Sequence, residues 1–312
     1  MLPNGDKIRR LVSVAQMYYE QNLNQSDIAE SIGVSRPMVS KLLTEARELG
    51  IVTITIKQVL DAQQMLCEQV KERFGLRDAI IVREQRLQAE TNMEIASAAV
   101  QLALDTVGDP QLIGIGWGSM IGKMADYLEA LKMPLPGQGE VFPLIGGINA
   151  SYRSYHTNEL VRIFADKTEL EASYLYMPAI FDSEAECKLF ENTEAYHGIR
   201  EKWSCMTTAI LNISNYPSTP DVATAYRFGD LLTKGGAVGH FLAHYYDRNG
   251  TIIEPVHDNI IQIPIPMIKK ASNVIALCAC NMRMEAALGA LNSGLITALA
   301  ASDEFVMQLL QL

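Results

Sequence analysis

The chain has 312 residues, of which 48% are hydrophobic and 20% are charged, and its formal net charge is −10 at pH 7. This composition is typical of a globular protein and excludes a disordered or collagen-like chain, and the length predicts about two domains. We find neither a long apolar run nor a secretory signal, so we expect a cytoplasmic protein without a membrane partner.

The acidity is unevenly distributed along the chain. Residues 1–56 carry as many basic as acidic side chains, so the whole net charge of −10 belongs to the remainder. The five cysteines are scattered and form no CxxC pair, which argues against a zinc or redox motif and predicts reduced, mostly buried thiols. A small neutral module is therefore joined to a larger acidic one.

Three short helices are predicted in the neutral module. Apolar side chains repeat every three or four residues, and small polar residues stand where helix N-caps are expected. The predicted helices cover Lys7–Gln21, Gln25–Ile32 with the N-cap Asn24, and 36–49 with the N-cap Ser35. Gly33 supplies a turn between the last two helices, and Gly50 ends the third.

A helix, a glycine turn and a second helix form the layout of helix-turn-helix DNA-binding modules. The third helix has polar and basic side chains opposite its apolar stripe, near the end that such modules insert into the major groove. Arginine can bind guanine bidentately, serine or lysine can reach a base or a phosphate, and N–H groups that begin the preceding helix can hold a phosphate. The predicted DNA-binding residues are Gln25, Ser26, Ser35, Arg36, Pro37, Ser40 and Lys41. A small helical bundle with solvated charges is the alternative interpretation.

The segment NQSDIAESIGVSRPMVSKLLTEARELGIVTI, residues 24–54, resembles the N-terminal DNA-binding module of the SorC/DeoR-type sugar-binding transcriptional regulators. In that family the module precedes a large effector domain of the sugar-phosphate isomerase type. After the module, residues 51–56 alternate as in a strand, and 59–74 form an amphipathic helix. We therefore predict a helix-turn-helix domain over 1–56, a linker helix over 57–75, and an effector-binding and oligomerisation domain over 76–312.

Apolar strands alternate with helices through the large module. The predicted strands are Ala79–Val82, Leu112–Ile115, Val141–Leu144, Ala172–Leu175, Thr208–Ile213, Val274–Ala279 and Leu295–Leu299. The predicted helices include Glu90–Thr106, Ile121–Leu131, Asn158–Lys167, Glu184–Phe190, Met282–Leu291 and Asp303–Leu310. Such alternation predicts an α/β fold with a Rossmann-like parallel sheet covered on both faces.

Two glycine-containing loops follow predicted strands of this sheet. They are Gly114–Met120 and Gly146–Gly147, and both lie at the carboxyl edge, where ligands bind in such sheets. Glycines let a phosphate approach backbone N–H groups at a helix N-terminus. The first loop lacks the GxGxxG phase of a dinucleotide site, and a tight turn that needs small residues is the alternative.

Four segments of the large module resemble the same family: GWGSM at 116–120, PLIGG at 143–147, GAVGHFLAHYYDRNG at 236–250 and NVIALCACNMRMEAALGALNSGLITALAAS at 273–302. The resemblance implies a Rossmann-like effector domain similar to sugar-phosphate isomerases, a phosphorylated sugar effector and a homotetramer of DNA-binding dimers. The predicted effector-binding residues are Gly116, Trp117, Gly118, Ser119, Met120, Gly146, Gly147, His240 and Arg283, with Lys123 as a substitute cation. His240 replaces a family aspartate, Arg283 replaces a lysine, and Ile145 stands where some members form a Schiff base through lysine.

The chain has no constellation that we assign to catalysis. His240 and His244 are predicted to lie one helical turn apart near Asp247, but without the HExxH pattern a metal site is not favoured. A GxSxG nucleophile elbow is absent from the sequence. We expect a sequence-specific transcriptional regulator of a carbohydrate operon that binds double-stranded operator DNA and a phosphorylated sugar, without catalytic activity, cofactor or metal. The alternatives are a sugar-phosphate isomerase-like enzyme and a DNA-binding regulator with a degenerate effector pocket.

Overall fold

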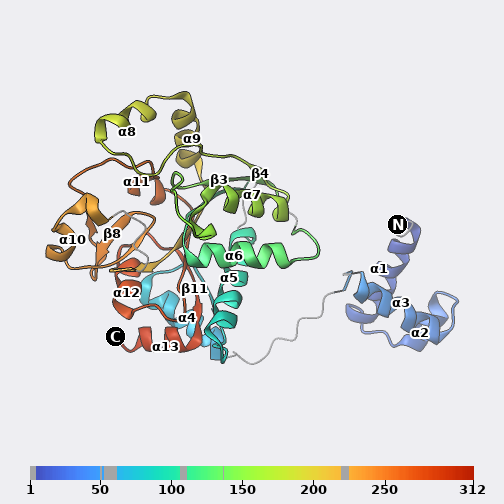
Figure 1. Cartoon of the computed structure of the whole chain (residues 1–312). Coiled ribbons are helices and arrows are strands. Elements are labelled where there is room, and N and C mark those ends of the chain that lie inside the picture. The colour runs from blue at the N-terminus through green and yellow to red at the C-terminus, as the bar shows by residue number, and fades with distance from the viewer. Residues whose placement is uncertain (1–4, 50, 53–61, 106–110, 136, 219–224) are drawn as a thin grey trace. The chain divides into compact units, whose positions relative to one another are not determined.

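The computed structural model describes residues 5–49, 51–52, 62–105, 111–135, 137–218 and 225–312. The chain divides into two compact units, Met1–Val59 and Leu60–Leu312, each with its own core (Figure 1). Among the described residues, no helix is both long and apolar enough to cross a membrane.

The first unit consists of three helices: α1 (Gly5–Tyr19), α2 (Gln25–Ser31) and α3 (Arg36–Glu48). Asn24 caps α2, because its side chain accepts hydrogen bonds from the backbone N–H groups of Ser26 and Asp27. Gly33 lies between α2 and α3 with φ +67°, a conformation that glycine adopts without strain. The apolar stripes of the three helices meet in one buried cluster, as the periodicity predicts.

The second unit is built on seven parallel strands in the order β1-β11-β10-β5-β2-β3-β4, which confirms the predicted α/β fold. The strands are β1 (Asp78–Val82), β2 (Gln111–Ile115), β3 (Gly139–Pro143), β4 (Glu171–Ala172), β5 (Thr208–Asn212), β10 (Asn273–Leu277) and β11 (Ala298–Ser302). After β2 the chain adds β3 and β4 toward one edge of the sheet. After β5 it adds β10 and β11 toward the other edge. The carboxyl ends of β2 and β5 therefore flank the point where the strand order reverses, where ligands bind in such folds.

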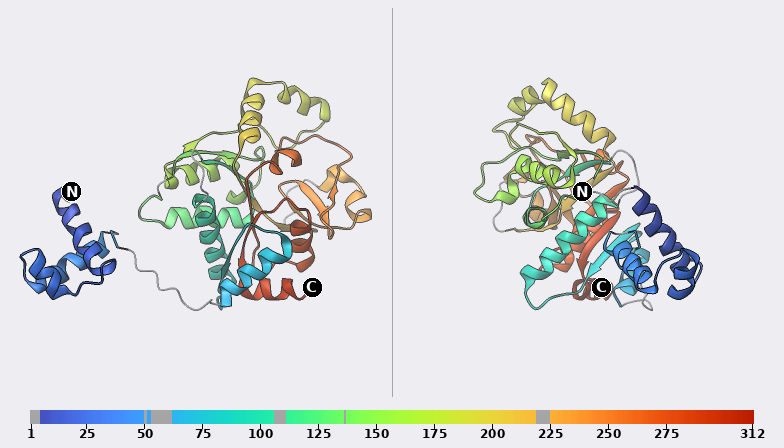
Figure 2. Two further views of the ribbon diagram at one scale, coloured as in Figure 1. Left: turned by 180° about the vertical axis from the view of Figure 1, so that it is seen from behind. Right: turned by 90° about the vertical axis from the view of Figure 1, so that its right-hand side faces the viewer.

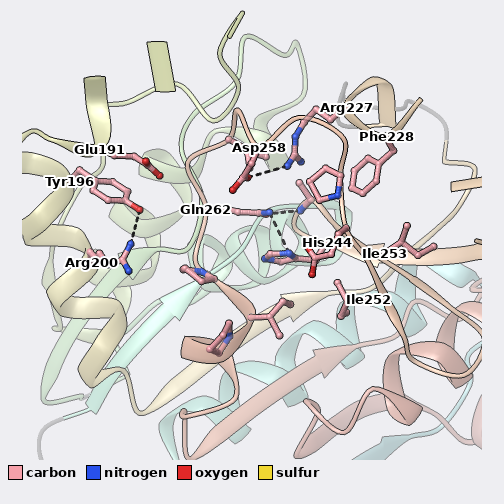
Figure 3. A pocket seen from close by; sticks show the side chains of 17 residues that line it. Glu191, Tyr196, Arg200, Arg227, Phe228, His244, Ile252, Ile253, Asp258 and Gln262 are labelled. Carbon is pink, nitrogen blue, oxygen red and sulfur yellow. Dashed lines mark hydrogen bonds and ion pairs between the residues drawn. The ribbon is translucent and has the colours of Figure 1, made fainter. Parts of the chain in front are cut away.

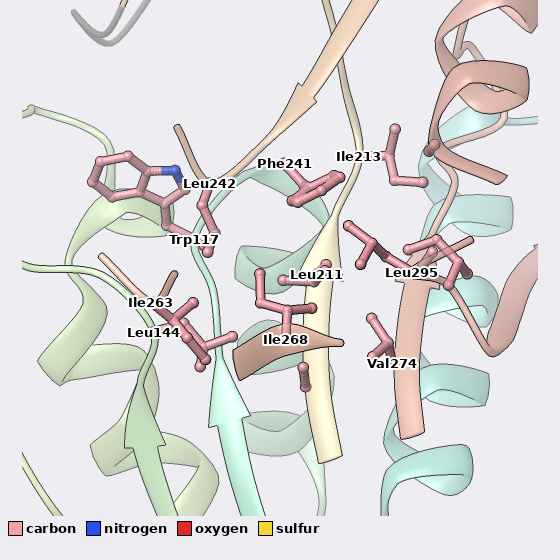
Figure 4. Close-up of a cluster of buried hydrophobic side chains, with 14 of the residues drawn as sticks. Trp117, Leu144, Leu211, Ile213, Phe241, Leu242, Ile263, Ile268, Val274 and Leu295 are labelled. Carbon is pink, nitrogen blue, oxygen red and sulfur yellow. The ribbon is translucent and has the colours of Figure 1, made fainter. Parts of the chain in front are cut away.

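Helices cover both faces of this sheet, and two separate cores lie between the layers (Figures 1 and 2). One face carries α5 (Gln88–Leu104), α6 (Ser119–Ala130) and α7 (Thr157–Thr168). The other carries α4 (Ala62–Phe74), α9 (Glu194–Cys205), α11 (Ile265–Ile268), α12 (Met284–Asn292) and α13 (Asp303–Leu310). Two short helices, α8 (Glu184–Glu191) and α10 (Leu231–Lys234), complete the unit. Figure 4 shows the core on the face that carries α4, α9, α11, α12 and α13. In it Trp117, Phe241 and Leu242 pack together with aliphatic side chains.

A second, four-stranded antiparallel sheet was not predicted from the sequence. It consists of β6 (Ser214–Asn215), β7 (Ala237–Phe241), β8 (His244–Asp247) and β9 (Ile252–Ile253), in that order. The helical interpretation of His240 and His244 was wrong, because these residues lie on the two strands of a hairpin. Leu242 makes the turn between the strands with φ +51°, which is unusual for a residue other than glycine.

The small sheet docks closely on α12. The hydroxyl of Tyr246 donates to the carbonyl of Ala286 at 3.0 Å. A Cβ atom at Gly289 would lie 2.4 Å from the Asp247 carbonyl oxygen, so only glycine allows this approach. At the next turn, Gly250 has φ +85° and lies against the backbone of Ser293, at the end of α12.

Helix α4 belongs to the second unit. It packs on β1 and α13, and Arg73 donates from Nη1 to the Leu310 carbonyl at 2.6 Å. Residues 75–77 alone separate the end of α4 from the start of β1, and the Cys67 thiol lies beside the backbone of Ile81, near the other end of that strand. The helix therefore runs antiparallel to β1 and begins near the carboxyl edge of the sheet.

The sequence predictions and the observed elements differ at several bounds. The first residues of the expected linker helix over 57–75 lie outside the described residues. Gly50 and most of the expected strand over 51–56 also lie outside them. Strand β4 is shorter than predicted. Strand β11 begins three residues later than predicted, because Gly294 ends α12 with φ +67° and Leu295 and Ile296 are buried in the loop that follows.

We expect Gly250→Ala to lower the free energy of unfolding by about 2–5 kcal/mol, because it combines an unfavourable backbone conformation with overpacking. A Cβ atom at position 250 would lie 2.2 Å from the Ser293 backbone nitrogen. Gly236→Ala is the matched control, since φ is +64° there but a Cβ would meet no atom within 4 Å. Its expected cost is about 1–2 kcal/mol. Urea denaturation compares the two, and equal losses would contradict the close packing of the small sheet on α12.

Candidate functional site

Helix α3 exposes the side chains that we predict to bind DNA. Arg36, Pro37, Ser40 and Lys41 are all exposed, whereas the apolar stripe of the helix is buried. Ser35 precedes the helix in an extended conformation, and its side chain makes no capping hydrogen bond. One face of α3, beginning at its N-terminus, is therefore polar and accessible.

The start of α2 and the start of α3 form one open hollow. Its volume is about 560 Å³, and it is lined by Tyr18, Asn24, Gln25, Ser26, Asp27 and Arg36. The structure thus brings the predicted Gln25, Ser26 and Arg36 together. The backbone N–H of Ser26 already donates to Asn24 Oδ1 at 2.9 Å, so a phosphate in this hollow would be held by side chains rather than by that N–H group.

Basic residues of α1, which the sequence analysis did not single out, lie beside Lys41. A groove of about 830 Å³ is lined by Lys7, Arg10, Met38, Lys41, Leu42, Thr44, Glu45 and Glu48. Lys7 forms an ion pair with Glu45. The groove places Arg10 of α1 beside Lys41, with Glu45 and Glu48 of α3 in the same wall, which only the packing of the two helices reveals.

The first glycine loop joins β2 to α6 at the carboxyl edge of the sheet. Trp117 is buried and packs edge-on against Tyr155, and Met120 is also buried, whereas Ser119 is exposed. The N–H groups of Gly116, Gly118 and Met120 donate to Ile210 O, Ser154 O and Asn212 Oδ1 at 3.0, 2.9 and 2.9 Å. These three N–H groups therefore hold the loop in place, and Ser119 is its exposed polar residue.

Asn212, at the end of β5, connects this loop to the small sheet. Its Oδ1 accepts from Met120 N, and its Nδ2 donates to Ser214 Oγ at 2.8 Å. The Asn212 side chain also lies against Gly118, where a Cβ atom would be 2.6 Å from it, and Gly118 has φ +122°. A glycine is required at 118 for both reasons.

The second glycine loop follows β3 and is held by other segments. Gly146 N donates to Ile261 O at 3.0 Å, and Gly147 N donates to Met177 O at 2.8 Å. A Cβ atom at Gly146 would lie 2.6 Å from the Pro178 carbonyl oxygen. Close backbone packing therefore accounts for the glycine at position 146.

His240 and Arg283 both contact the segment that contains β6, and the first glycine loop contacts the residue that leads into this segment, Asn212. His240 is buried on β7, opposite Ser214, and its Nδ1 lies 3.0 Å from the Leu242 carbonyl. Arg283 is exposed and stands at the N-cap of α12. Its N–H donates to Asn215 Oδ1 at 2.9 Å, and its guanidinium donates to the Tyr216 carbonyl.

The switch point of the sheet thus gathers several of the predicted residues. The loop at Gly118, His240 and Arg283 all contact residues 212–216, whereas the loop at Gly146 bonds to residues 177 and 261. The substitute cation Lys123 forms an ion pair with Asp126 at 3.1 Å. Among the residues that the structure describes, no three His, Cys, Asp or Glu side chains are grouped so as to hold a metal ion.

A family described as a putative sugar-binding domain matches residues 58–311. Among curated proteins, the sorbitol operon regulator of Klebsiella pneumoniae is 27% identical over 318 residues, which cover 99% of this chain and 100% of that protein. The deoxyribonucleoside regulator of Bacillus subtilis (strain 168) is 25% identical over 295 residues, or 92% of each chain.

The likeness extends to a solved structure. The full-length sorbitol operon regulator SorC from Klebsiella pneumoniae has a TM-score of 0.73 and 26% sequence identity to this chain. The alignment covers 98% of this chain and 100% of the other. The similarity therefore spans both units.

We expect Asn212→Ala to destabilise the second unit by about 1–3 kcal/mol, because it leaves the buried N–H of Met120 without its acceptor. Ser214→Ala is the control, since it removes a partner of the Asn212 amide but leaves the bond to Met120 intact. Its expected cost is about 1 kcal/mol or less. Chemical denaturation of the two variants tests this, and an equal cost would show that the bond to Met120 contributes nothing.

Proposed function

Because the chain belongs to the family of the putative sugar-binding domain, we propose that it is a DNA-binding transcriptional regulator of a carbohydrate operon, controlled by a phosphorylated sugar. The main support for this proposal is the exposed polar face of α3, which belongs to a compact unit in the same chain as the sugar-binding domain. The names of the relatives, a sorbitol operon regulator and a deoxyribonucleoside regulator, support the same role. We propose a cytoplasmic location, since DNA is the partner, and no catalytic activity or cofactor.

The DNA-binding surface comprises α3 and the start of α2. The N-terminal part of α3, with Arg36, Pro37, Ser40 and Lys41, enters the major groove in this proposal. Gln25, Ser26 and Ser35 contact the phosphate backbone beside it. Arg10 on α1, which lines the groove with Lys41, adds a positive charge for a further phosphate.

The effector site lies at the switch point of the parallel sheet. The Ser119 hydroxyl and the N-terminal end of α6 face this edge, and Arg283 supplies a positive charge at the start of α12. A guanidinium has five N–H donors, so the bond to Tyr216 leaves others for a phosphate. His240 and the loop at Gly146 complete the residues that we assign to the effector.

A homo-oligomer, most simply a tetramer of DNA-binding dimers, completes the proposal. One recognition helix reads too few base pairs for specificity, and symmetric dimers bind two half-sites of a two-fold symmetric operator. Light scattering of the full chain at micromolar concentration would give a monomer mass if this part of the proposal is wrong.

We expect Arg36→Ala to weaken operator binding by roughly 1–3 kcal/mol and to relax specificity at one base position. Lys41→Ala should weaken binding to all sequences and reduce the salt dependence of the affinity, because it removes a phosphate contact. Fluorescence anisotropy with an operator found by selection from random DNA measures both effects.

Arg47→Ala is the matched control for the two DNA-binding variants. Arg47 lies in the last turn of the same helix and hydrogen-bonds to Thr44, away from the end that we assign to the groove. Undiminished sequence-specific binding by the Arg36→Ala, Lys41→Ala double variant would overturn the assignment of α3 as the recognition helix.

Arg283→Ala should weaken binding of the phosphorylated sugar about 10- to 100-fold, as expected when a charge-assisted hydrogen bond of about 1.5–3 kcal/mol is lost. The DNA affinity of the ligand-free protein should not change. Calorimetric titration of the full chain with a panel of hexitol, hexose and pentose phosphates would identify the ligand and measure the effect.

Arg162→Ala serves as the control for Arg283→Ala, since Arg162 pairs with Glu159 and Asp166 on α7. Its ligand affinity should equal that of the unmodified protein. Normal binding by Arg283→Ala, or tightest binding of an uncharged sugar, would contradict the proposed phosphate site.

A further inference from the structure

Two hollows of the structure differ in how they are built. The pocket of the second unit is lined by segments that lie far apart in the sequence, with Arg227 and Gln262 among its polar side chains (Figure 3). The groove of the first unit is instead lined by two helices, α1 and α3, and has a volume of about 830 Å³. A small molecule needs walls on most sides, so a groove along two helices suits the extended surface of a macromolecule better.

Met38 lines this groove with an apolar side chain that the fold does not need. It is 45% exposed, whereas the next residue, Val39, is buried. Leu42, which also lines the groove, belongs to the buried cluster of the first unit. Among the described residues, Met38 is neither part of that cluster nor packed against it. Its apolar surface is therefore available to a partner.

Met38 lies in the first turn of α3, at the end that we assign to DNA. Its backbone N–H donates to the Ser35 carbonyl at 2.9 Å. Arg36 precedes it by two residues, and Lys41 follows almost one turn later and lines the same groove, as does Arg10 of α1. The methionine is therefore an apolar side chain among cations.

The charges along α3 indicate which part of the helix lies closest to a duplex. The first two turns carry Arg36 and Lys41 and no carboxylate, whereas the last turn carries Glu45 and Glu48 against the single cation Arg47. Phosphates are therefore attracted to the beginning of the helix and repelled from its end. The side chains of the first turn enter the major groove together, the apolar one included.

The base edges in the major groove are polar with one exception. Adenine, guanine and cytosine present hydrogen-bond donors and acceptors there, and only thymine adds a methyl group, at C5. Methionine is unbranched and has three rotatable bonds, so its side chain adapts to the position of such a group. An exposed methionine at the reading end of α3 therefore matches a thymine, whereas a cytosine at the same position offers an N4 amino group and no methyl.

We propose that Met38 contacts the C5 methyl group of one thymine in each half-site of the operator and thereby distinguishes thymine from cytosine at that position. The inference rests on the proposed function, since it takes α3 as the recognition helix. Arg36 reads a base by hydrogen bonds and Lys41 contacts a phosphate, whereas Met38 supplies an apolar contact that selects a further base.

The experiment replaces the thymines of the selected operator by deoxyuridine, one symmetric pair at a time. Deoxyuridine lacks only the methyl group and keeps every hydrogen-bonding group of the base. We expect fluorescence anisotropy of the full chain to show a loss of affinity at one pair of about fourfold for each half-site. This factor corresponds to about 0.8 kcal/mol for one buried methyl group.

Met38→Ala should bind the unmodified operator more weakly and should show no further loss at that deoxyuridine pair. Met38→Leu should keep most of the dependence on the methyl group, because its side chain is still apolar. Leu49→Ala is the matched control, since Leu49 is 46% exposed and lies about three turns beyond Met38 on the same side of the helix. It should bind both operators as the unmodified protein does.

The outcomes separate this inference from the proposed function. A chain that selects no operator from random DNA overturns both. Sequence-specific binding that needs Arg36 and Lys41 but depends on no thymine methyl group overturns the role of Met38 alone. That role is also overturned if Met38→Ala shows the same loss as the unmodified protein at every deoxyuridine pair, because the methionine then contacts something other than a methyl group.

Discussion

The buried amide of Asn212 is the interaction on which the switch point of the second unit depends. Its oxygen holds the N–H of Met120 after β2, and its nitrogen holds Ser214 at the start of the small sheet. One side chain thus fixes the loop that begins α6 and the segment that carries the small sheet away from β5. Because the amide fills the space beside Gly118, the loop has no room for a side chain there. Ser119 belongs to the loop that this amide holds, and His240 and Arg283 contact Ser214 and Asn215, which follow Asn212 in the chain.

Local rules predicted most of the fold. Asn24 caps its helix as expected, Gly33 has a positive φ, and every strand of the large sheet except β4 contains an apolar run between helices. The small sheet was missed because its strands are short, and because Phe241, Leu242 and Ala243 are apolar without a clear period. The hairpin turns at Leu242, which has a positive φ. Leucine is not among the residues, such as glycine and asparagine, that usually mark such a turn in a sequence.

The candidate sites depend more on contacts between distant residues. The spacing of the glycines located the first loop, but the partner of Met120 N is 92 residues away, so the role of Asn212 needed the three-dimensional structure. Arg227 stands in a segment without a motif. Its side chain is buried, and its Nε donates to the carbonyl of His257, 30 positions later, which no local pattern relates to it. The exposed face of α3 was predictable because a single helix determines it.

The direction of α4 places its start beside the sheet edge that carries the switch-point loops. Because this helix runs back along β1, its first residue, Ala62, lies near the carboxyl end of that strand. Three strand spacings, about 14 Å, separate β1 from β5 along that edge. The ends of β10 and β11 therefore lie between the strand that α4 covers and the strand that carries Asn212.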